Sequence, residues 1–433
     1  MSLWAFRFLL WYICVLMVQP QNRFPFLWPL HIADICVVMA VGLHVASAIT
    51  EKRPVIRFGP ATITGLVLFV MAYISLYIGA YQSSSGWNDY IDILTKNVLV
   101  MILVEAMAIN IHRVWAVLTT MMLSSLWWIK GGLRLSAAGA TYSGDRLMGP
   151  ASSLVENPNG FAYMMCVMIP LFLYFYQQSK HKVIRWFFMF LTLASVFIVF
   201  RTGSRTGMLI LITLGLFLLP KYGGQYKMTL IVGAFAIFMI LPLIGALNIQ
   251  RFKTIPRALL SVVGVDVEMG LEDEQSMQSA NERKYKNRDA WKLIKEHPLF
   301  GAGISPNERL FERKFPMATG QVHCEILMSG RQMGIVGMSI YVALLGIMLV
   351  QGRRIQKYAA GWWPEMADLG WTLKMQMLVF AVGGAFSPLP WNAPELILVG
   401  AASALWNNVK EQEFASGNFD AKGAAPARVE GTV

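Results

Sequence analysis

Two arginines four residues apart, Arg201 and Arg205, lie between two of the most apolar runs of the chain, in the segment VFRTGSRTG. An isolated arginine there would simply extend its side chain to the lipid headgroups. This pair instead flanks a Gly-Ser turn that leads into the next apolar run, and the first N–H groups of a helix attract anions. Guanidinium groups also bind phosphate oxygens through two parallel hydrogen bonds. We therefore interpret the segment as a phosphate or pyrophosphate site.

A second candidate segment is NRDAWKLIKEHPLFGAGI, residues 287–304. Residues 281–296 suit a helix that ends at the following His-Pro pair. Helical spacing puts four of its cationic side chains on one face: Lys284, Arg288, Lys292 and Lys295. An ordinary solvated basic face accounts for the last two lysines, and periodicity alone leaves the role of Arg288 open.

The third candidate is His323, in QVHCEILMSGRQMGIVG, where a long polar segment meets an apolar run. Imidazole is the side chain whose proton affinity suits general acid–base catalysis near neutral pH. A lone histidine is more often structural, so the residue type leaves both roles open.

Membrane helices must position these side chains. Of the 433 residues, 56% are hydrophobic and 14% are charged, which is too few polar residues to cover a soluble domain of this length. Several runs of roughly 17–22 residues are long enough to cross a hydrocarbon core, and no strand-like alternation suggests a barrel. The four cysteines are scattered, so we expect neither a disulfide framework nor a metal site. In a membrane protein the net charge of +12 reports topology rather than nucleic-acid binding.

The pattern predicts an all-α polytopic membrane protein with about twelve transmembrane helices and a large periplasmic loop between helices 9 and 10. The predicted spans are 3–18, 31–49, 61–80, 91–110, 114–129, 161–178, 185–200, 206–220, 228–247, 334–350, 367–385 and 392–407. The distribution of Lys and Arg over the loops predicts that both termini are cytoplasmic, and the first apolar run, which lacks a cleavage site, is predicted to be a retained helix. The domains are then helices 1–9 (1–248), the periplasmic loop with short helices (249–333), helices 10–12 (334–407) and a disordered cytoplasmic tail (408–433).

Four segments occur in order between about 145 and 337: GDRLMGPASSLVENPNGFA, FRTGSRTG, NRDAWKLIKEHPLFGAG and HCEILMSGRQMGIVG. Together they resemble the O-antigen ligase and polysaccharide polymerase superfamily. Its members share an R-x-x-G…N-P-N-x-x-A element, an S-R-x-G turn, an element with an arginine and a tryptophan followed by P-x-x-G-x-G, and a histidine that opens the next helix. Members commonly have His-Asn where this chain has His323-Cys324, with a polar Glu325 next.

The resemblance implies a glycosyltransferase-C-like bundle in the bacterial inner (plasma) membrane. It implies transfer of a glycan from an undecaprenyl-pyrophosphate donor at the periplasmic face, with His323 as the base. A pyrophosphate leaving group needs fixed positive charge, which Arg201, Arg205 and Arg288 would supply without a metal. Arg146 would hold a donor or acceptor phosphate. We expect no cofactor and no nucleic-acid partner.

The first reading is an O-antigen ligase, an inverting enzyme whose acceptor is the lipid A–core of lipopolysaccharide. A repeat-unit polymerase of O-antigen or exopolysaccharide and a protein O-oligosaccharyltransferase remain alternatives, because acceptor sites are not readable from one sequence. A transporter of lipid-linked glycan would place polar residues near mid-membrane. The candidates for buried ionisable residues are few, and both of them, Glu105 and Lys374, lie toward the inner ends of their predicted helices. The arginines instead crowd the outer face, which favours an enzyme.

Overall fold

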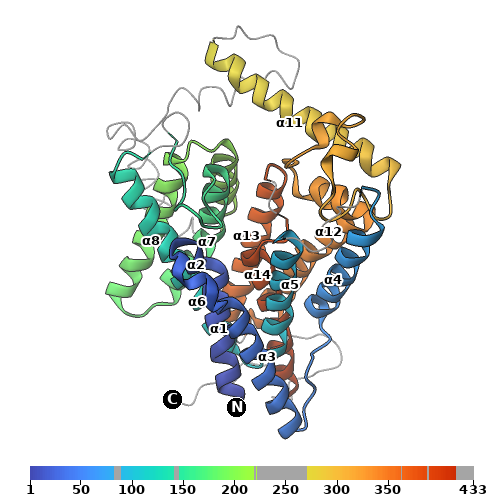
Figure 1. The fold of residues 1–433 in the computed structure, drawn as a ribbon. Coiled ribbons are helices and arrows are strands. Elements are labelled where there is room, and N and C mark those ends of the chain that lie inside the picture. Colours follow the sequence, from blue (N-terminus) through green and yellow to red (C-terminus); the bar gives the residue numbers. More distant parts are fainter. Residues whose placement is uncertain are drawn as a thin grey trace.

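The computed structural model describes residues 1–81, 89–140, 146–218, 221, 271–361, 363–387 and 390–415. Within these ranges the chain forms helices and turns and no strand (Figure 1). The long helices are α1 (Ser2–Val18), α3 (Ile32–Thr50), α4 (Pro60–Ile78), α5 (Asp89–Met107), α6 (Ile111–Ala137), α7 (Pro158–Gln178), α8 (Lys182–Arg201), α11 (Leu271–Glu296), α12 (Glu325–Ala359), α13 (Pro364–Gly384) and α14 (Ala393–Ala415). Short helical segments are α2 (Pro20–Arg23), η1 (Pro25–Leu30), η2 (Glu308–Leu310) and η3 (Pro316–Ala318), and a further apolar helix runs over Arg205–Leu218.

The chain has the architecture of a helical membrane protein. Each predicted span except 228–247 overlaps one of these helices. Span 228–247 lies outside the described residues, so the total of about twelve remains a prediction. In the described part of the chain five helical segments are long and apolar enough to cross a membrane: Pro25–Thr50, Pro60–Ile78, Pro158–Gln178, Lys182–Arg201 and Glu325–Ala359.

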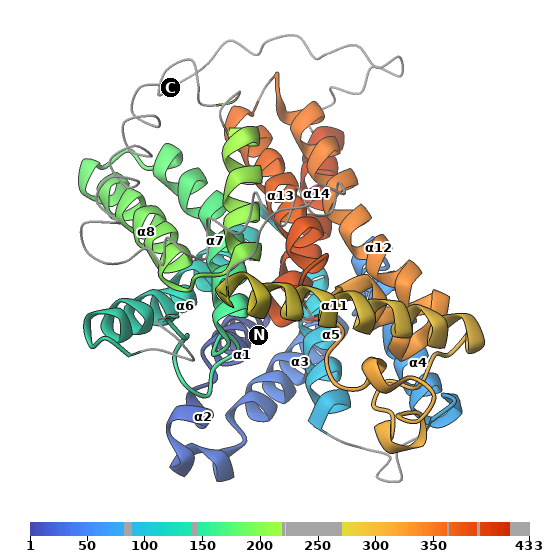
Figure 2. The ribbon, with the colours of Figure 1, turned by 90° about the horizontal axis from the view of Figure 1, so that it is seen from above.

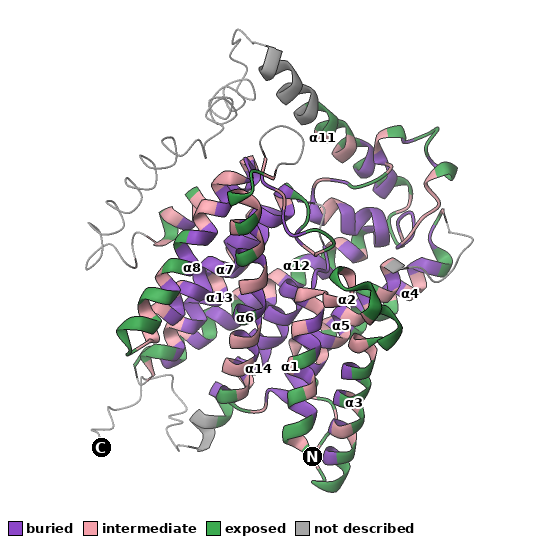
Figure 3. Cartoon of the chain, turned by 60° about the vertical axis from the view of Figure 1, so that its left-hand side comes forward, coloured by how far each residue is buried: buried purple, intermediate pink, exposed green. Residues whose placement is uncertain are grey.

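The centre of the bundle is formed by α7 and α14. α7 and residues 393–405 of α14 are apolar on nearly all sides, the composition expected of a helix surrounded by others. α7 packs between α8 and α13, and α14 packs against α5, α6 and α12 (Figure 2). Burial is nearly complete along α7 and along residues 393–405 of α14, in contrast to the exposed apolar side chains of the outer helices (Figure 3). A Cβ at Gly400 would lie 2.6 Å from the carbonyl oxygen of Met101, so the glycine permits the close approach of α14 to α5.

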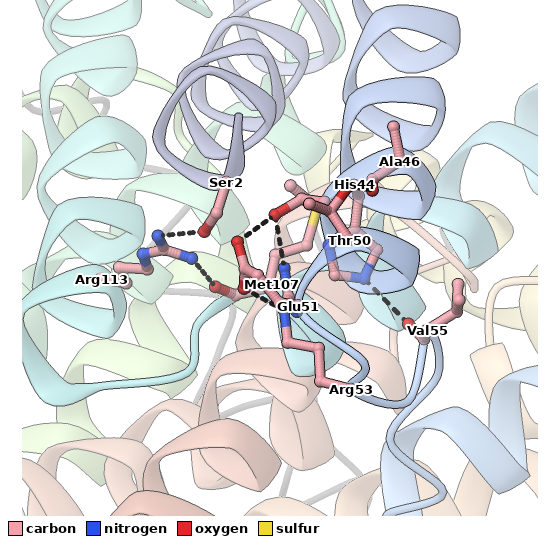
Figure 4. Close-up of polar contacts among 10 residues, drawn as sticks. Ser2, His44, Ala46, Thr50, Glu51, Arg53, Val55, Met107 and Arg113 are labelled. Atoms are coloured by element: carbon pink, nitrogen blue, oxygen red, sulfur yellow. Dashed lines mark hydrogen bonds and ion pairs between the residues drawn. The ribbon is translucent and has the colours of Figure 1, made fainter.

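The bundle has two ends, and polar contacts identify the one that carries the N-terminus (Figure 4). Arg113 donates to Ser2 Oγ at 2.8 Å and to the carbonyl oxygen of Met107 at 3.0 Å. Nearby, Arg53 Nε lies 2.7 Å from a carboxylate oxygen of Glu51. We call this the N-terminal end; the other end is the α11 end, because α11 lies across it (Figures 1 and 2).

α12 is interrupted near its start, at Met333 and Gly334, which have non-helical backbone angles. The loop after α11 enters this break, since Pro298 O accepts from the Ile335 N–H at 2.7 Å and the Ala302 N–H donates to Arg331 O at 2.7 Å. Gly334 has φ +63°, and a Cβ there would lie 2.2 Å from Pro298 O. The P-x-x-G-x-G element therefore satisfies backbone groups that the break leaves without helical partners.

Candidate active site

All five predicted site residues lie at the α11 end. Arg201 ends α8, Arg205 begins the next helix, and Arg146 precedes α7; Arg288 lies in α11, and His323 lies two residues before α12. The first three are held by α6, α7 and α8, and the other two by α11 and α12. The helices thus bring the residues to one end of the bundle as two groups.

α6 fixes the position of the first group. It starts beside Ser2 at the N-terminal end, and its 27 residues span about 40 Å. Its last turn is therefore at the α11 end. There Arg201 Nε donates to Ser136 Oγ at 3.1 Å.

Arg146 stabilises the turn that follows α8 through hydrogen bonds. Its Nε donates to the carbonyl oxygen of Thr202 at 3.0 Å, and its Nη2 donates to Asn159 Oδ1 at 2.7 Å. The backbone N–H of Leu147 donates to the carbonyl oxygen of Arg201 at 2.9 Å. We call Arg146, Arg201 and Arg205 the arginine cluster. The R-x-x-G…N-P-N-x-x-A element thus supports the turn, and a role for Arg146 in phosphate binding remains a prediction.

The turn between the two predicted pyrophosphate arginines depends on small residues. Gly203 has φ +57°, the left-handed region that glycine adopts at low cost. Ser204 caps the following helix, because its Oγ accepts from the Gly207 N–H at 3.2 Å. A Cβ at Gly207 would lie 2.7 Å from Ala162 Cβ on α7, so glycine lets the two helices touch. Arg201 and Arg205, both partly exposed, therefore flank the positive end of a helix.

His323 lies against α11 and is half-buried. Burial, together with the nearby cations of Arg283 and Lys286, lowers the pKa of His323 to about 4, while the Glu282 carboxylate acts in the opposite direction. The imidazole is therefore neutral at pH 7. A neutral imidazole can accept a proton, as a general base must.

Arg288 does not share the side of α11 that faces His323. Its side chain is 57% exposed, with Nε 3.5 Å from Asp289 Oδ1 and the guanidinium 4.9 Å from the Tyr285 ring centre. Sequence reasoning missed Arg283 and Lys286, which do affect His323. Their positions follow the helical period of the buried side chains Ala290, Leu293 and Ile294, and that apolar face was the signal that could have found them.

Two buried glutamates lie in α12 and α14. Glu325 is fully buried and accepts a hydrogen bond from Tyr341, and Glu395 on α14 is also fully buried, with Asn392 Nδ2 3.3 Å from its carboxylate. Of the two ionisable residues expected to be buried, Glu105 is fully buried and Lys374 is partly buried, and Glu325 and Glu395 were not expected. Among the described residues no group of three or more His, Cys, Asp or Glu side chains could hold a metal ion.

Comparison with known families gives the class of the protein. Residues 187–342 match the family model described as O-antigen ligase. This match supports the assignment of residues 187–342 to the O-antigen ligase and polysaccharide polymerase superfamily. Residues 4–180 match a family of unknown function, and no curated protein matches the chain. The resemblance drawn from the four sequence segments is confirmed at this level.

The O-antigen ligase segment extends from α8 to the part of α12 beyond its break, and it contains Arg201, Arg205, Arg288 and His323. Arg146 lies in the other matched segment, and its bond to Thr202 joins the two. Members of the matched family are glycosyltransferase-like ligases or polymerases, and the match supports this general type of activity for the chain.

Proposed function

We propose that this protein is an O-antigen ligase. It transfers a polysaccharide from undecaprenyl pyrophosphate to the lipid A–core of lipopolysaccharide at the periplasmic face of the bacterial inner membrane. The reaction inverts the anomeric centre and uses no metal ion. The observation that carries the proposal is that the segment matching the O-antigen ligase family contains both the two-arginine turn and His323.

The arginine cluster would promote departure of the pyrophosphate. When the bond between the anomeric carbon and the pyrophosphate oxygen breaks, negative charge grows on that oxygen. Fixed cations and helix N–H groups stabilise such charge without reorganising during the reaction. Arg201 and Arg205 flank a helix start and so combine both kinds of donor.

His323 would act as the general base. The acceptor hydroxyl attacks the anomeric carbon on the side opposite the leaving group, and its proton passes to the neutral imidazole. A base with a pKa of about 4 holds a proton weakly. Bound pyrophosphate would offset the charges of Arg283 and Lys286, and we expect the pKa of His323 to rise when the donor binds. Donor binding would thereby prepare the base.

The experiment that tests this function is a transfer assay with the purified protein and undecaprenyl-pyrophosphate glycan. Three acceptors are compared: lipid A–core, a second donor molecule and a pilin-type peptide. Transfer to lipid A–core that is lost in His323→Ala supports a ligase. Transfer only to the second donor identifies a polymerase, and transfer only to the peptide identifies a protein O-oligosaccharyltransferase. Either of these last results would refute the proposed acceptor.

A further inference from the structure

The outward face of α11 exposes two large aromatic rings, each accompanied by a cation. Tyr285 is 45% and Trp291 42% exposed. The Arg288 guanidinium lies 4.9 Å from the Tyr285 ring centre, and Lys295 Nζ lies 5.7 Å from the Trp291 ring centre. Exposed aromatic side chains grouped on one face of a helix often mark a binding surface.

These side chains form one stripe. From Tyr285 to Lys295 the helix advances ten residues, or about 15 Å, and the residues between recur at intervals of three or four. The opposite side of α11 carries the buried Ala290, Leu293 and Ile294 and packs against α12 and η3. The stripe, which we call the aromatic–basic stripe, consists of Tyr285, Arg288, Trp291, Lys292 and Lys295.

The stripe is positively charged. Between positions 281 and 296 six residues are cationic and three are acidic. The acidic groups already have partners: Glu282 pairs with Lys286 at 2.9 Å, and Glu296 pairs with Lys314. The third, Asp289, has a side chain that is 7% exposed and lies 3.5 Å from Arg288 and 3.4 Å from Lys292. A ligand would therefore meet rings and cations, and its own charge should be negative.

The composition of the stripe distinguishes a sugar from a lipid surface. Helices that bind membranes from the side expose Trp, Phe or Leu on one face and carry their basic residues on the other, whereas the rings and cations of α11 share one face. Between 281 and 296 every aliphatic side chain of α11 is buried. Aromatic rings pack against the C–H faces of sugar rings through the same apolar contacts by which they pack in proteins. Lysine and arginine bind phosphate or carboxylate groups on such sugars.

We propose that the aromatic–basic stripe binds anionic sugar residues of the glycan acceptor, those that carry phosphate or carboxylate groups. Trp291 stacks on a sugar ring, and Lys292 and Lys295 bind its anionic substituent. The assignment of this saccharide as the acceptor rests on the proposed function, whereas the binding itself does not.

Binding can be measured by calorimetry on the full-length protein in neutral detergent. The probes are a synthetic phosphorylated oligosaccharide, its dephosphorylated form and water-soluble short-chain phosphatidylglycerol. We expect the phosphorylated saccharide to bind about tenfold or more tightly than the neutral one, as charge-assisted hydrogen bonds allow. Lys292→Gln/Lys295→Gln should remove most of that preference. Arg309→Gln/Arg313→Gln removes the same charge from exposed positions outside the stripe and should retain the preference.

Trp291→Ala should weaken the binding of both saccharides by about tenfold. Trp291→Phe should retain most of the wild-type affinity, because an aromatic ring remains for stacking. Equal binding of the phosphorylated and neutral saccharides would overturn the proposal, as would equal losses in the two double variants. Binding of phosphatidylglycerol with the same dependence on Lys292 and Lys295, but no saccharide binding, would identify a lipid surface instead. A stripe that binds the saccharide while transfer to lipid A–core fails would leave this site standing and refute only the proposed acceptor.

Discussion

Replacement of Lys286 by methionine tests the origin of the low pKa of His323. Lys286 is one of two cations that lower this pKa, and it pairs with Glu282, whose carboxylate raises it. The variant loses the cation and leaves the carboxylate unpaired, so both changes raise the pKa. A charged neighbour at close range shifts a pKa by about 1–3 units. Because Lys286 contributes less than burial and Arg283, we expect about one unit, equivalent to about 1.4 kcal/mol.

The assay is the pH dependence of kcat/KM in the transfer reaction. His323 must be neutral to act as a base, so the rate falls as the pH drops through its pKa. With a pKa of about 4, the wild type should lose activity only in the acid range. Lys286→Met should move this loss to higher pH. Glu282→Gln should move it lower, because it removes the contribution that raises the pKa.

Lys284→Met serves as the control, because Lys284 lies on the exposed face of α11, is not part of the aromatic–basic stripe and does not contribute to the pKa of His323. This variant should leave the low-pH midpoint of the kcat/KM profile at its wild-type value. A wild-type midpoint near the ordinary histidine value of about 6.5 would refute the reasoning. Identical shifts in Lys286→Met and Lys284→Met would also refute it, since they would report the net charge of α11 alone.

Three further predictions concern the fold, the arginine cluster and the chemistry. Gly334→Ala should lower the free energy of unfolding by about 2–4 kcal/mol, because it combines a positive φ with a Cβ 2.2 Å from Pro298 O. Gly346→Ala, whose Cβ would have nothing within 4 Å, should be neutral or stabilising in the same thermal unfolding experiment. Asn159→Ala removes the hydrogen-bond acceptor for Arg146 Nη2 and should weaken binding of the undecaprenyl-pyrophosphate donor by about tenfold. An unchanged dissociation constant would show that this hydrogen bond is not needed for donor binding. Purified protein should retain full activity in excess EDTA, and a loss of turnover that magnesium or manganese restores would reveal a carboxylate metal site.

Most of the helices could be predicted because apolar runs of membrane length are visible in one sequence. Span 61–80 corresponds to α4 at Pro60–Ile78. α12 is different: it was predicted from 334 and begins at Glu325. Its first turns contain Glu325, Ser329, Arg331 and Gln332, all buried within the protein. Hydropathy cannot distinguish such residues from those of an exposed loop, because their burial depends on other helices.

The candidate site shows a similar division. Helical spacing correctly predicted that Lys284, Arg288, Lys292 and Lys295 share a face, and all four are exposed. It could not show that the other face of α11 lies beside His323, because that contact joins residues about 40 positions apart. The hydrogen bond from Arg146 to the carbonyl oxygen of Thr202 likewise depends on packing among α6, α7 and α8. Local periodicity assigns residues to faces, and tertiary structure decides what each face meets.

The central claim is that arginines bind the donor and His323 carries out the chemical step. Its most direct test measures the donor dissociation constant and the single-turnover rate for Arg201→Ala, Arg205→Ala and His323→Ala. The arginine variants should bind the donor more weakly and transfer more slowly, and lysine should rescue them only partly, because it lacks the paired donors of a guanidinium. His323→Ala should leave the donor dissociation constant nearly unchanged and slow the single turnover by roughly 10²–10⁴-fold. If His323→Ala abolishes donor binding while turnover per bound donor stays normal, the account is contradicted and another residue is the base.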